Sequence, residues 1–84
     1  MPRSAIVWKQ DRIADVPLRR FVGCVGPIEV GSVEYDGTHQ LWTWWSPLND
    51  EAWGHAASEV GAKQGFEVWL RGWLEHFRPL LEAG

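Results

Sequence analysis

Residues 28–45 hold the pattern that most restricts the fold of this chain: two runs of strand-forming residues separated by Asp36-Gly37. An Asp-Gly dipeptide supplies the positive φ angles of a two-residue type I′ turn, the connection that β-hairpins favour. The sequence therefore predicts a β-hairpin over residues 28–45. A two-residue turn also fixes the strand register, with Tyr35 opposite Thr38.

The two faces of this hairpin are expected to differ. Successive residues of a strand point to opposite faces, so Trp42 and Trp44 share one face and Trp45 lies on the other. The predicted register places Trp42 opposite Gly31, where an indole has room to lie over the strand. The face of Trp45 also receives three apolar side chains, those of Ile28, Val30 and Leu41.

A helix is predicted over residues 58–77. Ser58 suits the N-cap position, because its hydroxyl can accept a hydrogen bond from a free backbone N–H of the first turn. Apolar residues then recur at helical spacing, at Ala62, Phe66, Trp69, Leu70, Trp73, Leu74 and Phe77. Pro79 disfavours helical geometry in the residue before it. The main helix should therefore end near residues 76–77, and Pro79 can start one more turn.

Together these elements predict an α+β domain. Residues 1–27 are expected to be irregular, with an edge strand near residues 5–8, because Pro and Gly interrupt the rest. A helix of about 18 residues and a strand of about eight both span roughly 27 Å. We therefore expect a single domain over residues 1–84, a small antiparallel sheet of three to four strands with one C-terminal helix packed across one face.

Seven of the 84 residues are Trp, and the predicted faces divide them. Four fit the interface between sheet and helix: Trp42, Trp44, Trp69 and Trp73. Trp45 lies on the face that a single helix cannot also cover. Either the N-terminal residues Ile6, Trp8 and Phe21 fold over that face, or another chain does. In the second case the interface would use Trp8, Ile28, Val30, Leu41, Trp45 and Trp53, since Trp is enriched at binding hot spots.

Charge is distributed unequally, although the net charge is only −3. Residues 1–20 hold five basic and two acidic side chains, whereas residues 21–84 hold three basic and nine acidic ones. Nucleic-acid-binding proteins usually carry a basic stripe that contacts phosphates. Here that contact would come from Arg12, Arg19 and Arg20, and the acidic remainder disfavours broad nucleic-acid binding.

No catalytic, cofactor or metal site is predicted. The three His residues and Cys24 lack the spacing of metal ligands. His39 is expected beside Glu34 across the hairpin, an ordinary surface contact. The chain has no Gly-rich phosphate loop and no G-x-S-x-G nucleophile motif.

The same composition favours a cytoplasmic protein. A single Cys cannot form a disulfide within one chain. No apolar run approaches the roughly 18 residues that a membrane span needs. Residues 1–5 lack the apolar stretch of a secretory signal.

A series of features between residues 31 and 74 carries a resemblance. It comprises Gly31-Ser32-Val33, the Trp42-x-Trp44 strand, Gly54-His55-Ala56-Ala57-Ser58, and then Ala62, Phe66 and Trp69-x-x-x-Trp73. In these features the chain resembles a class of small uncharacterised bacterial and prophage-type proteins with a domain of unknown function. The resemblance covers about half the chain and implies a hairpin followed by a helix. It transfers no functional residue.

From the residues we expect a non-enzymatic interaction module that binds itself or a protein partner through an aromatic sheet face. The alternative is a nucleic-acid-binding module, with the arginines on phosphates and an exposed Trp stacked on bases. A related alternative is a phage-type inhibitor that docks onto a nucleic-acid-handling protein.

Overall fold

The computed structural model describes residues 5–83. Residues 1–4 and 84 lie outside the described part. Arg3 of the basic N-terminal segment is among them. So are most of residues 1–5, on which the expectation of no secretory signal rests. The described residues form five strands and two helices: β1 (Val7–Ile13), β2 (Val16–Val25), β3 (Ile28–Asp36), β4 (Leu41–Trp45), β5 (Trp53–Ala56), α1 (Glu59–Glu75) and α2 (Arg78–Ala83).

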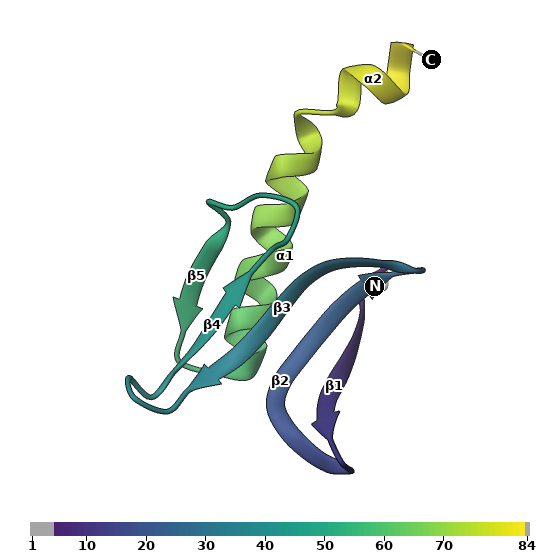
Figure 1. The fold of residues 1–84 in the computed structure, drawn as a ribbon. Coiled ribbons are helices and arrows are strands. Elements are labelled where there is room, and N and C mark those ends of the chain that lie inside the picture. Colours follow the sequence, from purple (N-terminus) through teal and green to yellow (C-terminus); the bar gives the residue numbers. More distant parts are fainter. Residues whose placement is uncertain (1–4, 84) are drawn as a thin grey trace.

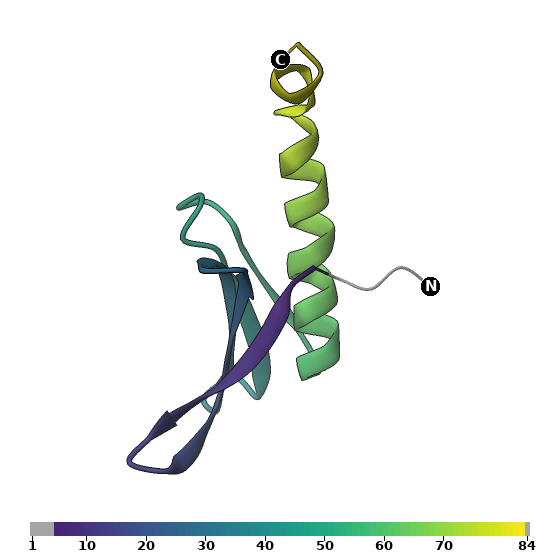
Figure 2. The ribbon, with the colours of Figure 1, turned by 90° about the vertical axis from the view of Figure 1, so that its right-hand side faces the viewer.

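The strands form one antiparallel sheet in the order β1-β2-β3-β4-β5, and α1 packs on one of its faces (Figure 1). Seen from the side, sheet and helix make two layers, and the C-terminal end of α1 and α2 extend beyond the sheet (Figure 2). The expected α+β class, with a C-terminal helix packed on an antiparallel sheet, is confirmed. The expected strand number is wrong, because the sheet has five strands rather than three or four.

The N-terminal residues are regular where the sequence suggested irregularity: β1 overlaps the expected edge strand, and β2 is additional. β5 is a further additional strand between β4 and α1. β1 and β2 form a long hairpin whose turn is Ala14-Asp15, with Ile13 paired to Val16. Both turn residues have positive φ, 48° and 68°, as a two-residue type I′ turn requires. Pro17 is tolerated because it stands next to this turn, close to a shift of register in β1.

The β3–β4 hairpin exists, but its predicted register is wrong. Tyr35 pairs with Trp42 instead of Thr38, because residues 37–40 form a longer loop. The Asp36 carboxylate accepts hydrogen bonds from the backbone N–H of Thr38 and of His39, at 2.9 and 3.3 Å, and Gln40 has a φ of 55°. The pairing moves by four residues, an even number, so the predicted division of side chains between the two faces is kept.

The core lies between α1 and the sheet. Phe66 is fully buried, and its ring occupies the space above Gly31 where the sequence placed the indole of Trp42. Trp8 and Trp44 contact the Phe66 ring edge-on, at centroid distances of 5.6 and 6.2 Å. Trp42 packs instead against Tyr35, at 5.5 Å. Small residues on the strands therefore let the helix approach the sheet closely.

The helix ends agree with the sequence signals. The Ser58 hydroxyl accepts a hydrogen bond from the Gly61 backbone N–H at 3.0 Å, which makes Ser58 the N-cap. His76 is the C-cap of α1, and α2 follows as a separate short helix of six residues. Position and length of the main helix thus follow from its cap and from Pro79.

Candidate interaction surface

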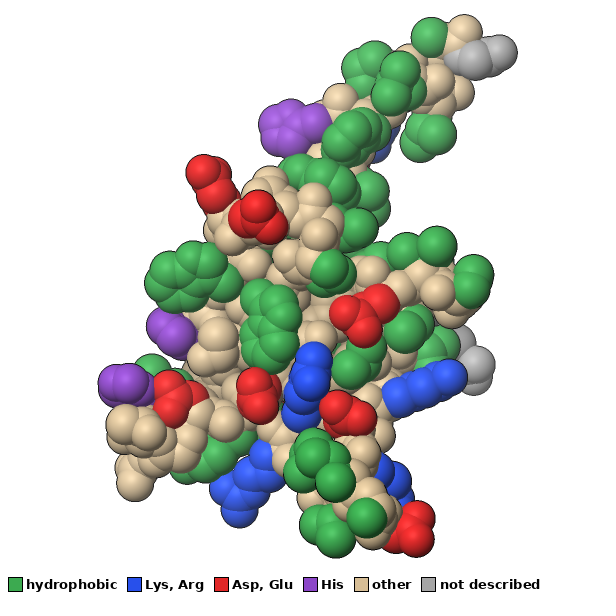
Figure 3. All heavy atoms as spheres, in the orientation of Figure 1, with side chains coloured by type: hydrophobic (Ala, Val, Ile, Leu, Met, Phe, Trp, Pro, Cys, Tyr) green, Lys and Arg blue, Asp and Glu red, His purple; other side chains and the backbone are tan. Residues whose placement is uncertain are grey.

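The face of the sheet opposite α1, here called the outer face, is described by two rows of paired residues. One row contains Val22, Ser32, Trp45 and Trp53, and the other contains Arg20, Glu34, Thr43 and His55. Figure 3 views this face and shows charged side chains of both signs around hydrophobic ones. The expected second apolar face is therefore a mixed surface, polar in one row and aromatic in the other.

The N-terminal residues do not cover this face. Ile6 and Trp8 pack against the core under α1, and Phe21 contacts the side chain of Trp42 on the same side, at 6.4 Å. Of the two alternatives for covering Trp45, the one in which these N-terminal residues fold over it is wrong. β1 and β2 instead add to the edge of the sheet, because β2 pairs with β3 and β1 pairs with β2.

The two outer-face tryptophans have different surroundings. Trp45 is half-buried, and the Arg20 guanidinium lies 5.7 Å from its ring centroid. Trp53 is 59% exposed and meets the His55 ring edge-on at 5.3 Å. Thr43 is hydrogen-bonded to His55 through Oγ1 and Nδ1, 3.1 Å apart. Trp45 is thus held in place, whereas Trp53 offers a large open surface.

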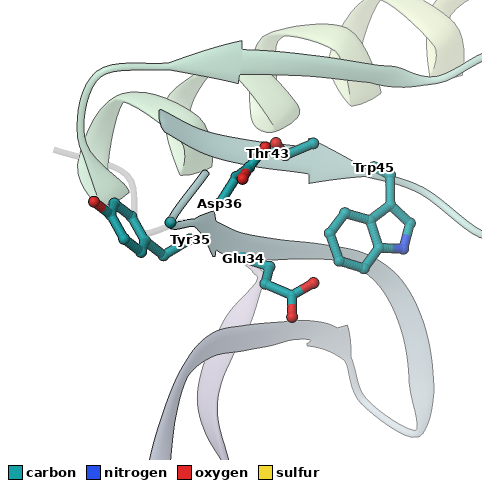
Figure 4. Close-up of a pocket in the computed structure, with 6 residues that line it drawn as sticks. Glu34, Tyr35, Asp36, Thr43 and Trp45 are labelled. Carbon is teal, nitrogen blue, oxygen red and sulfur yellow. The ribbon is translucent and has the colours of Figure 1, made fainter. Parts of the chain in front are cut away.

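A hollow of about 390 Å³ opens beside Trp45. Figure 4 shows the side chains around it, and its lining residues are Glu34, Tyr35, Asp36, Gly37, Thr43 and Trp45. The hollow combines an indole wall, a threonine hydroxyl and two carboxyl groups. Aromatic faces and carboxylates both attract cations.

The two carboxylates of the hollow differ in their partners. Asp36 accepts a hydrogen bond from His39 Nδ1 at 2.7 Å, and this bond is the main cause that lowers the pKa of Asp36 below its ordinary 3.8. His39 therefore pairs with Asp36. The predicted contact between His39 and Glu34 is wrong. Within residues 5–83, Glu34 has no ion pair, although Arg20 is its neighbour on β2.

The Arg20 side chain points away from Glu34, toward Asp11 of β1. Its Nη1 lies 3.4 Å from Asp11 Oδ2, and its guanidinium stacks over Trp45. The buried Arg20 Nε and the buried Ser32 hydroxyl find no hydrogen-bond partner among the described residues. Arg20 consequently packs on Trp45 and forms no ion pair with the Glu34 carboxylate.

The residues predicted for an interface are dispersed by the fold. Trp45 and Trp53 lie together on the outer face, because β4 pairs with β5. Trp8 and Val30 pack in the core instead. Ile28 is exposed where β3 begins, and Leu41 is half-buried at the start of β4. Strand alternation places Glu34 and Thr43 on the face of Trp45, but the sequence analysis did not single them out as part of an interface.

The three arginines proposed for phosphate contacts do not share a surface. Arg12 lies near the tip of the first hairpin and donates to the Asp15 carbonyl at 3.4 Å. Arg19 stacks over Tyr35 at 4.8 Å, on the helix side of the sheet, and Arg20 lies on the outer face. Adjacent strand residues point to opposite faces, so Arg19 and Arg20 cannot form one basic stripe.

Comparisons with protein families, curated proteins and solved structures gave no match. The resemblance to bacterial and prophage-type proteins stays a prediction. Within residues 5–83, no group of three or more His, Cys, Asp or Glu side chains could hold a metal ion. No helix in that part of the chain is both long and apolar enough to cross a membrane.

Proposed function

We propose that this protein is a non-enzymatic interaction module whose outer face binds a basic segment of a partner protein. The observation that carries the proposal is the Glu34 carboxylate, which has no ion pair within residues 5–83 and lies with the Trp45 indole in one hollow. A lysine or arginine side chain entering the hollow would meet the carboxylate and the aromatic wall together.

Physical chemistry favours a cation at this place. An ammonium or guanidinium group is attracted by the face of an indole, and a charge-assisted hydrogen bond to a carboxylate is roughly twice as strong as a neutral one. Asp36 adds a second negative charge, since its lowered pKa keeps it ionised in mildly acidic solution. The net charge of −3 steers a basic partner toward the protein as a whole.

Trp53 extends the binding surface beyond the hollow. Trp is the residue most enriched at interaction hot spots, and 59% exposure leaves much of its apolar area to be buried by a partner. Its position beside Trp45 places an apolar contact next to the cation site. We therefore expect the partner segment to combine a basic residue with an apolar or aromatic one. The composition of the chain favours a cytoplasmic partner.

The proposal is tested with a short acetylated peptide that alternates arginine and tryptophan, titrated calorimetrically. Glu34→Gln should weaken binding about tenfold, because it removes the carboxylate of the hollow and keeps its shape. Glu82→Gln is the matched control, since it removes the same charge from α2. Its affinity should stay within a factor of two. Equal losses in both variants would show attraction to net charge alone and contradict the proposal.

An oligothymidine titration separates the nucleic-acid alternative. We expect no binding at moderate salt, because the basic residues are dispersed over different surfaces. If the oligonucleotide binds more tightly than the peptide, with an affinity that falls steeply with salt, stacking on Trp53 with phosphate contacts replaces the proposed function.

A further inference from the structure

Strand β5 is an edge of the sheet. Among residues 5–83 it pairs with β4 alone, because the strand order ends with it. Figure 1 shows β5 at the left margin of the fold, with α1 behind the sheet rather than beside it. The outer side of an edge strand carries unpaired backbone N–H and C=O groups, to which an extended segment of another chain can bind as an additional strand.

The hydrogen bonding between β4 and β5 identifies these unpaired groups. The Ser46 backbone N–H donates to the Ala52 carbonyl at 3.1 Å, one step beyond the β4–β5 pairs and in the same register. Hydrogen-bonded pairs alternate along an antiparallel ladder, so Gly54 also bonds to β4. The backbone groups of Trp53 and His55 therefore point away from β4, toward the open edge. Two such positions suit a short segment.

The two edges of the sheet are protected to different degrees. β1, the opposite edge, contains Lys9, Asp11 and Arg12, and its pairing with β2 shifts register between Gln10 and Arg12. Charged side chains and bulges are usual means by which an edge avoids further pairing. β5 consists of Trp53-Gly54-His55-Ala56, without Lys, Arg, Asp, Glu or Pro and without a register shift. β5 is therefore the edge better suited to accept a strand.

The charge around this edge favours a basic segment over a second copy of the chain. Residues 21–62, which include β3, β4 and β5, contain six acidic residues and no Lys or Arg. Asp50 and Glu51 precede β5, are exposed, and have no ion pair within residues 5–83. Pairing β5 with β5 of another copy would bring these acidic stretches together, whereas a basic segment would be attracted to them.

We propose that the partner's basic segment binds as a sixth strand along β5, an inference that rests on the function proposed above. A residue that pairs with Trp53 or His55 has its side chain on their face of the sheet, the outer face. An arginine there stands two strands, roughly 10 Å, from Trp45. Arg20 crosses the same two-strand distance from β2, since its guanidinium lies 5.7 Å from the Trp45 ring centroid. An arginine of the added strand would reach the hollow from the opposite side.

Backbone methylation of the peptide tests the inference without changing the protein. Two versions of the acetylated arginine–tryptophan peptide carry equal numbers of N-methyl groups, one on the arginines and the other on the tryptophans. In an added strand every second backbone N–H bonds to β5, and the others face solvent. With the arginines on the outer face, methylated arginines should weaken binding at least about tenfold, whereas methylated tryptophans should weaken it no more than about threefold.

Hydrogen exchange followed by NMR gives the matching readout on the protein. Binding of the unmethylated peptide should slow the exchange of the Trp53 and His55 backbone N–H groups, because these groups gain a partner strand. The Gly54 N–H is the internal control, since it already bonds to β4 and its exchange should change little.

The outcomes separate the added strand from the proposed function. Equal losses from both methylated peptides, or unchanged exchange at Trp53 and His55 on binding, would overturn the added strand even where Glu34→Gln still weakens binding. Exchange at these two residues that is slow in the concentrated protein alone and becomes fast on dilution would place a second copy on the edge, which also overturns it. A wild type that does not bind the unmethylated peptide contradicts the proposed function, and the inference with it.

Discussion

At the level of single residues, Gly31 sets how closely α1 lies on the sheet. A Cβ atom at Gly31 would overlap the fully buried ring of Phe66. Gly31→Ala should therefore lower the free energy of unfolding by about 2 kcal/mol, the usual cost of overpacking a core. Thermal denaturation followed by circular dichroism measures the change.

Gly72 provides the matched comparison, because it lies in α1 and a Cβ there meets nothing within 4 Å. Gly72→Ala should raise the free energy of unfolding by about 0.5–1 kcal/mol, since alanine loses less backbone entropy in a helix. Two alanine variants with effects of the same sign would contradict this account of the helix–sheet contact.

Asp36 gives a residue-scale prediction in the acid range. Its pKa is lowered chiefly by the hydrogen bond from His39, so the ionised form is favoured in the folded state. The resulting stabilisation is present above the ordinary value of 3.8 and is lost as pH falls through the lower folded pKa.

His39→Ala should therefore raise the pKa of Asp36 toward 3.8 and weaken the pH dependence of stability in this range. Carboxyl-carbon NMR over an acid titration measures the pKa directly. His76→Ala, at the end of α1, should leave it unchanged. If the Asp36 pKa does not respond to the loss of His39, the hydrogen bond from His39 is not the cause of the lowered pKa, and the account is contradicted.

At the level of elements, the sequence predicts best what depends on local pattern. The hairpin at residues 28–45 and the helix from its Ser58 cap both follow from spacing and capping residues, and both are present. The register of the hairpin does not follow, because the Asp36 side chain binds two backbone N–H groups and thereby opens a longer loop. Asp-Gly alone does not distinguish these two turns.

The β1–β2 hairpin could not be predicted from the sequence, for a related reason. Its turn uses Ala14 at a φ of 48°, a conformation that alanine rarely adopts and that no propensity rule indicates. Pro17 further weakens the strand signal. The outer face could be predicted only in part. Strand pairing brings Glu34, Thr43 and His55 together from three strands, and the register of that pairing cannot be obtained from the pattern of one sequence.

The strained turn leads to an element-scale prediction. Ala14→Asn should raise the free energy of unfolding by about 0.5–1 kcal/mol, because asparagine tolerates the left-handed conformation at the first position of a type I′ turn. Urea denaturation measures the gain. Ala57→Asn serves as the control at an exposed alanine without positive φ, and no gain is expected there. Equal effects would show that the turn stores no strain.

At the level of the whole molecule, two surfaces of different chemistry lie apart from each other. The outer face combines carboxylates with two tryptophans, and the projecting helical end exposes Leu74, Phe77, Leu80 and Leu81. Because α1 covers the opposite side of the sheet, Phe66 and the partly buried Trp8, Trp44, Trp69 and Trp73 pack together in the core. We propose that partner binding uses Trp45 and Trp53 on the outer face, whereas the aromatic side chains under α1 hold the core together.

The most direct measurement of that division is an NMR titration of the seven indole N–H groups with the arginine–tryptophan peptide. The resonances of Trp45 and Trp53 should shift together with the backbone amide of Glu34. Those of Trp8, Trp44 and Trp69 should stay in place. Shifts centred on the core or helical tryptophans, or an absence of shifts at Trp45 and Trp53 while the peptide binds, would contradict the claim that the outer face is the binding surface.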